Sequence, residues 1–283
     1  MRHHLRGQDH LLPRFAAALL CAELGLANPS RPRGSFLFIG PTGTGKTELA
    51  LCFTDYVFGP DHVHRFDLSE YQNQSAVEKL IGASPTDRGL LGRILAAHSC
   101  GTLLFDEMEK AHPLLLDLFL QLLDPGRITL ATGETMSVSG WYLIFTSNLG
   151  SAEVMRMERS SFATIEAAVL RRVTQKLRPE FGPRINEKFV FARLTPEAQR
   201  EIAELLVTRE LARLRGLGHD LAVSSAALEF LVREGYDPQL GARPLRRTVE
   251  RNLQEAVVRS LFAHGFARGR VEPDGARLTV MSG

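Results

Sequence analysis

Residues 39–48 read Ile-Gly-Pro-Thr-Gly-Thr-Gly-Lys-Thr-Glu, and this stretch decides the fold of the chain. The run at residues 35–39 has the length and aromatic content of a buried strand, and residues 49–53 after the glycines favour a helix. The spacing from Gly40 to Gly45, Lys46 and Thr47 matches G-x-x-x-x-G-K-[ST] at every fixed position. A strand, a glycine-rich loop and a helix in this order indicate a phosphate-binding loop rather than an ordinary turn.

Each part of this loop has a chemical reason to bind a nucleoside triphosphate. Glycine lets backbone N–H groups turn inward around phosphate oxygens, and the start of the following helix adds a partial positive charge. Lys46 can reach the β- and γ-phosphates, and the Thr47 hydroxyl can ligate Mg²⁺. The loop residues that we expect to bind the nucleotide are Gly40, Pro41, Thr42, Gly43, Thr44, Gly45, Lys46 and Thr47.

Further along the chain, polar residues follow two more apolar runs. Asp106 and Glu107 end the run at residues 103–105, at the strand edge where ligands bind in open parallel sheets. We expect Asp106 to hold Mg²⁺ through its water shell and Glu107 to orient and deprotonate the attacking water. Asn148 closes the next buried strand and could position that water. A solvated acidic turn is the alternative for the two carboxylates, and the apolar run before them disfavours it.

The composition is that of an ordinary globular protein. At 283 residues the chain is long enough for one large domain, or for a large domain with a smaller partner. A net charge of +2 gives no indication of binding to nucleic acid or to a membrane surface. The three cysteines are widely spaced in apolar segments, so we expect reduced thiols and no metal knuckle. Because no apolar run could span a bilayer and the first residues do not resemble a signal peptide, we expect a cytoplasmic protein without membrane partners.

The hydrophobic pattern changes near Arg193. Before it, strands and helices alternate, which predicts an α/β fold with a mainly parallel sheet covered on both faces. The strands are expected at residues 35–39, 63–68, 103–107, 142–146 and 189–191, the helices at 9–26, 49–53, 76–81, 90–97, 114–123 and 165–177, and a hairpin or long loop at 124–140. After the helix-start signal Thr195-Pro196-Glu197, helices are expected at 197–214, 225–234 and 243–262, with short strands at 220–223, 269–272 and 277–281.

Six motifs follow one another along the chain: Gly7-Gln8-Asp9, the glycine loop at 40–47, residues 104–113 (Leu-Phe-Asp-Glu-Met-Glu-Lys-Ala-His-Pro), residues 146–150 (Thr-Ser-Asn-Leu-Gly), Arg178-Pro179-Glu180-Phe181 with Arg184-Ile185-Asn186, and Gly235-Tyr236-Asp237-Pro238 with residues 241–245 (Gly-Ala-Arg-Pro-Leu). Their order and spacing resemble the Clp branch of the AAA+ ATPases. The chain looks most similar to the C-terminal ATPase module of ClpB-type disaggregases, and the resemblance covers nearly its whole length.

This resemblance implies a P-loop ATPase domain at residues 1–192 and a small, mainly α-helical lid domain with a small sheet at residues 193–283. It implies hydrolysis of ATP with Mg²⁺ as cofactor. It also implies a homo-oligomeric ring, usually a hexamer, with ATP bound at the subunit interfaces. Such rings act on protein clients or adaptors.

Four further site assignments come from the resemblance. Asn148 looks like the sensor 1 residue, and Arg243 looks like the sensor 2 arginine that reaches the γ-phosphate from the lid of the same subunit. Arg184 looks like the arginine finger that enters the neighbour's site. The segment at residues 5–8, beginning with Leu5 and Arg6, would line the adenine pocket. Without the surrounding motifs, we would expect Arg184 and Arg243 each to form an ordinary ion pair at the surface.

The sequence departs from the family pattern where Clp unfoldases carry an aromatic pore loop. Residues 80–90 read Leu-Ile-Gly-Ala-Ser-Pro-Thr-Asp-Arg-Gly-Leu, which is shorter and has no aromatic residue. We therefore expect no threading by an aromatic paddle. The tripeptide loop that docks on a peptidase ring is missing from its usual place, so we expect no partner protease. The chain also begins close to the ATPase module, which leaves two alternatives, a whole small protein and an excised fragment.

Three hypotheses for the function remain at this stage. The first is a Clp-like ATPase that remodels a protein or a protein assembly. The second is a nucleotide-controlled assembly switch or scaffold with slow hydrolysis. The third is a nucleic-acid-associated AAA+ protein, which the near-neutral charge and the lack of a basic, aromatic-interleaved groove disfavour.

Overall fold

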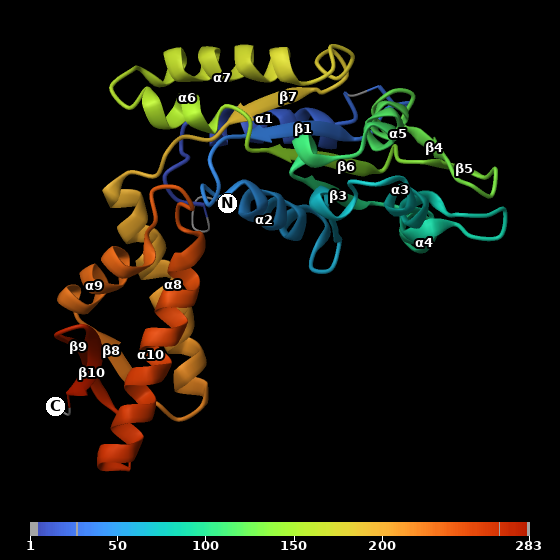
Figure 1. Ribbon diagram of the computed structural model, residues 1–283. Helices are drawn as coiled ribbons and strands as arrows, with labels where there is room; N and C mark the ends of the chain where they lie inside the picture. Colours follow the sequence, from blue (N-terminus) through green and yellow to red (C-terminus); the bar gives the residue numbers. More distant parts are fainter. Residues whose placement is uncertain (1–4, 27, 266, 282–283) are drawn as a thin grey trace. The chain divides into compact units, whose positions relative to one another are not determined.

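A computed structural model describes residues 5–26, 28–265 and 267–281 (Figure 1). The chain divides into two compact units, Met1–Pro41 with Gly45–Ala192 and Thr42–Thr44 with Arg193–Gly283. The first unit has two hydrophobic cores and the second has one.

The first unit is built on a five-stranded sheet whose paired strands all run parallel, in the order β2–β3–β6–β1–β7 (Figure 1). Every residue of β1, β3 and β6 is buried, which explains why these strands are nearly continuous apolar runs in the sequence. Because β6 lies between β3 and β1, the carboxyl ends of these three strands meet at one edge of the sheet. The strands are β1 (Gly34–Ile39), β2 (Val63–Asp67), β3 (Gly101–Asp106), β6 (Trp141–Ser147) and β7 (Glu187–Val190).

Helices cover both faces of this sheet, as the alternation along the chain predicts. Successive side chains of a strand point to opposite faces, so Leu37 and Ile39 belong to one core and Phe36 and Phe38 to the other. The second core is closed by α1 (Leu12–Glu23) and α2 (Lys46–Phe58). The first is closed by α3 (Gln74–Ile81), α4 (Gly89–Ala97), α5 (Pro113–Leu123), α6 (Ser151–Arg156) and α7 (Phe162–Lys176).

The shorter elements were harder to predict. Residues 124–140 do contain a hairpin, made of β4 (Arg127–Thr129) and β5 (Thr135–Ser137). Helix α6 was not predicted, because six residues are too few to establish a helical period. Two single-turn helices, η1 (Leu68–Glu70) and η2 (Met108–Lys110), were missed for the same reason.

A buried glutamine ties the start of the first unit to the end of its last strand. The side-chain amide of Gln8 donates to the carbonyl of Ala192 at 2.9 Å and accepts from the N–H of Ala192 at 3.0 Å. Gln8 is fully buried, so this two-way bond satisfies polar groups that water cannot reach. The Gly7-Gln8-Asp9 motif thus has a structural role in holding the segment that precedes α1.

The second unit packs three helices with a small sheet around its own core, in which Leu231, Leu245, Leu253 and Leu278 are buried. Its sheet has the order β10–β9–β8, with β8 parallel and β10 antiparallel to β9. Thr195 caps α8 by accepting the N–H of Ala198, which confirms the helix-start signal in the sequence. The elements are α8 (Pro196–Gly216), β8 (Leu221–Val223), α9 (Ser225–Gly235), α10 (Arg243–His264), β9 (Gly269–Asp274) and β10 (Arg277–Met281).

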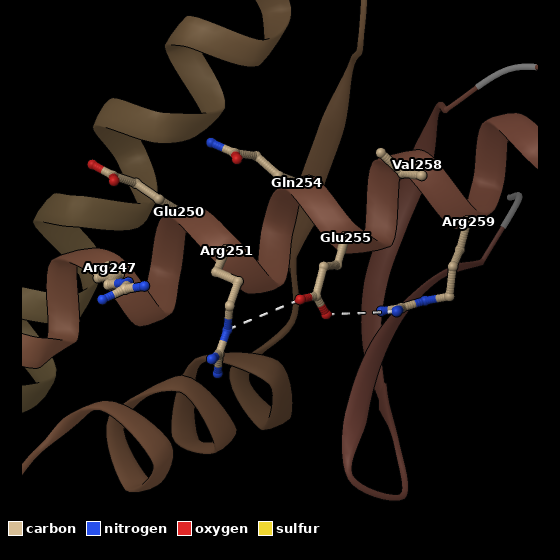
Figure 2. Close-up of a pocket in the computed structure, with 7 residues that line it drawn as sticks. All are labelled: Arg247, Glu250, Arg251, Gln254, Glu255, Val258 and Arg259. Carbon is tan, nitrogen blue, oxygen red and sulfur yellow. Dashed lines mark ion pairs between the residues drawn. The ribbon is translucent and has the colours of Figure 1, made fainter.

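A shallow hollow of about 550 Å³ lies along one face of α10, and Figure 2 shows that all its lining side chains come from this one helix. Glu255 pairs there with Arg251 at 4.0 Å and with Arg259 at 3.7 Å. These mutually paired charges are typical of a solvated helix face. None of the helices in the described ranges is both long and apolar enough to cross a lipid bilayer.

Candidate active site

The loop between β1 and α2 adopts backbone angles that glycine permits and other residues disfavour. Gly40 and Gly45 have φ values of 142° and 103°. A Cβ atom on Gly40 would lie 2.7 Å from the carbonyl oxygen of Phe191, so only glycine fits there. Gly45 precedes α2 and has no side chain to accept the first N–H groups of that helix, which leaves these donors for an anion.

Lys46 is buried at the start of α2, and three oxygen atoms surround its ammonium group. Its Nζ donates to the carbonyls of Gly40 at 2.6 Å and Pro41 at 2.8 Å, and to Oδ1 of Asn148 at 3.0 Å. Burial lowers the pKa of Lys46 to about 8, and the charges of Glu109, Asp106 and Glu107, in that order, act against this shift. Burial therefore disfavours the charged form of Lys46 more than the three nearby carboxylates favour it.

Asp106 ends β3 and is almost fully buried, with hydrogen bonds to both oxygens of its carboxylate. Its Oδ1 accepts from the Thr146 hydroxyl at 2.7 Å and lies 3.5 Å from the hydroxyl of Thr47. Its Oδ2 accepts from Nε of Arg65 at 2.6 Å. The predicted metal residues Thr47 and Asp106 thus lie side by side. In the described part of the chain, no group of three or more His, Cys, Asp or Glu side chains is arranged to hold a metal ion.

Glu107 follows Asp106 in a left-handed backbone conformation, with φ 60° and ψ 52°. For a residue with a Cβ atom this conformation costs roughly 1–2 kcal/mol, so the surrounding structure must impose it. The N–H of Glu107 donates to the Thr146 hydroxyl at 3.1 Å, and its Oε2 pairs with the Lys110 ammonium at 2.6 Å. Glu107 raises the pKa of Lys110 through this contact.

Asn148 follows β6 and connects the other groups of the site. Its Oδ1 accepts from Lys46, as described above, and its Nδ2 donates to Oε1 of Glu107 at 3.4 Å. Its backbone N–H donates to Oε1 of Glu109 at 3.0 Å. One amide side chain thus lies between the buried cation that ends the β1 loop and the carboxylate that follows β3.

Comparison with known families shows what this arrangement belongs to. Residues 31–188, more than half of the chain, match the family model described as AAA domain (Cdc48 subfamily), and every side chain of the group around Lys46 lies inside that match. The chain belongs to this family. In this AAA protein, residues 194–272 also match the model of the C-terminal, D2-small domain of ClpB.

Relatives of the AAA protein confirm the resemblance to the Clp branch. It is 39% identical to the chaperone protein ClpB 2 of Nostoc sp. PCC 7120, over 95% of this chain and 32% of the relative. It is 36% identical to the chloroplastic chaperone protein ClpC1 of Arabidopsis thaliana, over 98% of this chain and 32% of the relative. The chain thus spans about a third of the length of these curated relatives.

A solved structure confirms the fold class of the AAA protein. The closed state of Hsp104 with ATPγS and FITC casein superposes with a TM-score of 0.86 at 31% identity, covering 99% of this chain and 50% of that one. Members of this AAA+ group are ATPases. The P-loop fold with a mainly helical second part is therefore confirmed.

Of the two arginines predicted for the active site of this AAA protein, Arg184 lies in the first unit but outside the group around Lys46. Arg184 lies in the turn before β7, where its Nη1 donates to the carbonyls of Leu120 at 3.0 Å and Asp124 at 3.4 Å, at the end of α5. Arg243 is exposed and begins α10 in the second unit. Both roles, in trans for Arg184 and from the lid for Arg243, stay predictions.

The predicted adenine segment begins with Leu5, which is buried, and the half-buried Arg6. A Cβ atom on Gly45 would lie 2.6 Å from Cδ1 of Leu5, so this side chain lies against the glycine loop. This contact is compatible with the predicted place of Leu5, whereas the adenine pocket itself stays a prediction.

Four side chains of the site had no role in the sequence-based interpretation, namely Arg65, Glu109, Lys110 and Thr146. Arg65 could not be found because its contact with Asp106 depends on β2 being paired with β3, and strand order is not encoded locally. Glu109, Lys110 and Thr146 lie inside the quoted motifs. A signal existed for Thr146, since a polar residue near the end of a buried strand lies at the same edge of the sheet as the site residues. The directions of Glu109 and Lys110 depend on the left-handed turn at Glu107, which the sequence does not signal.

Proposed function

We propose that this AAA protein binds ATP together with Mg²⁺ and hydrolyses it. The observation that carries the proposal is the continuous chain of contacts from Lys46 through Asn148 to Glu107, at the sheet edge where Asp106 and Thr47 also lie. Lys46 offers a cation that can bind phosphates, and Thr47 and Asp106 offer two oxygen atoms that can bind a metal ion. Glu107 and Asn148 offer a carboxylate and an amide that can bind the attacking water. These are the groups that hydrolytic phosphoryl transfer requires.

The residues present fit Mg²⁺. Thr47 and Asp106 offer a hydroxyl and a carboxylate oxygen, which are ligands that Mg²⁺ prefers, and a small ligand set suits an ion that keeps several of its waters. Thr47 would bind the ion directly and Asp106 through the water shell. When bound, the ion would neutralise charge on the β- and γ-phosphates. Arg65 meanwhile holds the other oxygen of Asp106 and so fixes the orientation of its carboxylate.

Glu107 is the proposed general base. Its carboxylate would accept a proton from the attacking water, and Asn148 would orient that water through its amide. Because Oε2 of Glu107 is paired with Lys110, this oxygen has to exchange the ammonium group for water before it can accept the proton. Lys110 thus competes with the attacking water for this oxygen.

We propose that assembly into a homo-oligomeric ring, a hexamer, completes the active site, because Arg184 would come from a neighbouring chain. Arg184 would then leave the end of α5 and stabilise charge on the neighbour's nucleotide, and Arg243 would reach the γ-phosphate from the lid. An arginine supplied in trans is worth roughly 10³–10⁵ in rate. Leu5 and Arg6 would line the adenine pocket.

We further propose that hydrolysis remodels a protein client without an aromatic pore loop. Residues 82–88 between α3 and α4 form a loop closed on itself, in which Asp87 accepts the N–H groups of Ala83 at 3.2 Å and Gly89 at 2.9 Å. Arg88 joins this loop to the β4–β5 hairpin through Glu134 at 2.9 Å. A short loop with its own hydrogen bonds and no aromatic side chain supports a contact surface more than a grip on an extended chain.

The remaining parts of the proposal concern partners and location. We propose a protein client or adaptor, no peptidase ring, no membrane partner, no nucleic acid and a cytoplasmic location. The nucleotide-controlled assembly switch stays the second candidate. The closed loop at residues 82–88 supports it as well as it supports remodelling, because neither function requires threading of a client.

The test uses two variants whose defects lie on different chains. Glu107→Gln removes the base and Arg184→Ala removes the finger, so each alone should lose Mg²⁺-dependent ATPase activity. Mixing the two should restore part of it, because a mixed interface can pair an intact Glu107 with an intact Arg184. If an assembled wild-type ring does not hydrolyse ATP, the proposal fails.

A tagged, folded test protein separates remodelling from the assembly switch. Unfolding or disassembly of a client during hydrolysis supports remodelling. Slow hydrolysis with nucleotide-dependent oligomers in light scattering and no effect on a client supports the switch.

A further inference from the structure

Glu109 is a half-buried carboxylate at the active site to which the proposed reaction gives no role. It lies in η2, directly after the left-handed Glu107, and this reversal of the backbone turns residue 109 back toward the end of β6. There its Oε1 accepts the backbone N–H of Asn148 at 3.0 Å. Its Oε2 is buried and has no hydrogen-bond partner in the described part of the chain.

The bond from Glu109 acts on the residue that connects the site. The side chain of Asn148 spans Lys46 and Glu107, so a small rotation of its backbone would move both contacts. A hydrogen bond to an ionised carboxylate is shorter and about twice as strong as a neutral one. Glu109 therefore fixes the backbone of Asn148, whereas Lys46 and Glu107 contact its side chain.

An ordinary structural role explains this carboxylate poorly. A neutral amide could accept the same N–H, and leaving a charged oxygen buried without a partner costs free energy.

We propose that Glu109 is a positioning residue for ATP hydrolysis, which holds the amide of Asn148 at the orientation that the attacking water requires. This inference rests on the proposed function, since it assigns Asn148 to the water. It concerns the rate of the chemical step and not the binding of nucleotide, because the contact of Glu109 is with the backbone of Asn148.

The test compares Glu109→Ala with Glu109→Gln, whose amide oxygen can still accept the N–H of Asn148. Glu109→Ala should lower kcat roughly tenfold or more, which corresponds to about 1.4 kcal/mol of transition-state stabilisation, while KM and the Kd of a fluorescent ADP analogue change less than about twofold. Glu109→Gln should recover part of kcat, because its amide oxygen keeps the bond to the N–H of Asn148 in a weaker, uncharged form. Glu78→Ala, which removes an exposed carboxylate on α3, is the matched control and should behave like wild type.

Two further measurements separate positioning from folding. Hydrogen exchange in the nucleotide-free chain should speed up at the amide of Asn148 in Glu109→Ala and not in Glu109→Gln. In an Asn148→Ala background, Glu109→Ala should lower kcat no further, because both changes remove the same function. A full additional loss there, an unchanged kcat in Glu109→Ala, or no recovery in Glu109→Gln would each overturn the inference.

Failure of the inference and failure of the proposed function give different results. If the wild-type ring neither binds nor hydrolyses ATP, the proposed function fails whatever Glu109 does. If the wild type is active and Glu109→Ala matches it in kcat and in hydrogen exchange, only the inference fails.

Discussion

At the scale of single residues, Glu107 shows a conflict between backbone and side chain. Its φ of 60° suits glycine, whereas its proposed chemistry needs a carboxylate. We expect Glu107→Gly to be more stable than Glu107→Ala by about 1 kcal/mol, because both lose the carboxylate and only alanine keeps the Cβ atom that the left-handed conformation disfavours. Urea unfolding of the two variants measures this difference. Equal stabilities, or a less stable glycine variant, would show that the backbone relaxes at this position.

Lys46 supplies a prediction about protons. Its pKa of about 8 means that about half of the chains carry a neutral Lys46 at pH 8, and nearly all carry the ammonium form at pH 6.5. A bound triphosphate favours the ammonium form, so binding should take up about 0.5 proton per site at pH 8. Calorimetry of nucleotide binding in buffers with different ionisation enthalpies measures this uptake. The proton uptake should decline when the pH is lowered toward 7, because Lys46 is then already charged before the nucleotide binds. An uptake that does not decline would show that Lys46 is not the group that takes up the proton.

At the scale of elements, α8 and α10 are joined by a buried carboxylate. Glu210 of α8 accepts two bonds from Arg213, at 2.8 and 2.6 Å, and one from Gln254 of α10 at 3.3 Å. The bonds from Arg213 lower the pKa of Glu210, while burial acts against them. A carboxyl group with a lowered pKa in the folded state stabilises the fold above its unfolded pKa, and this contribution is lost as the pH falls through the folded value.

We therefore expect Glu210→Gln to lower the free energy of unfolding by about 1–2 kcal/mol at pH 7. The difference from wild type should shrink at acidic pH, as the pH falls through the lowered pKa of the folded wild-type group and that group is protonated as well. Glu204→Gln on the same helix removes an exposed ion pair and should change stability by less than about 0.5 kcal/mol. An effect of Glu210→Gln that is the same at pH 7 and at acidic pH would show that the charge is not involved.

The elements also show what a sequence can and cannot predict here. The strand that ends in Asp106 and the strand before Asn148 were predictable because each is a continuous apolar run, and the glycine loop because its residue types are fixed by the backbone. The contacts of Arg65 and Glu109 were not predictable. The first depends on which strand lies beside β3, and the second on the left-handed turn at Glu107, which the residue type does not signal.

At the scale of the whole molecule, Arg184 links the proposed activity to assembly. In the single chain its guanidinium group donates to the carbonyls at the end of α5, so assembly has to replace those bonds with contacts to a neighbour's nucleotide. A site completed in this way cannot work in an isolated chain. ATPase activity per chain should therefore rise with protein concentration and level off when light scattering shows complete assembly.

Arg184→Ala should bind nucleotide with wild-type affinity and lose roughly 10³-fold in kcat at every concentration. Arg184→Lys keeps a charge near the carbonyls of α5 but lacks the paired donors of a guanidinium group, so it should assemble and still fail to hydrolyse at the wild-type rate. If activity per chain stays constant from the dilute monomer to the assembled ring, Arg184 does not act across an interface. The site around Lys46 would then have to be complete within one chain, and the ring would serve the client and not the chemistry.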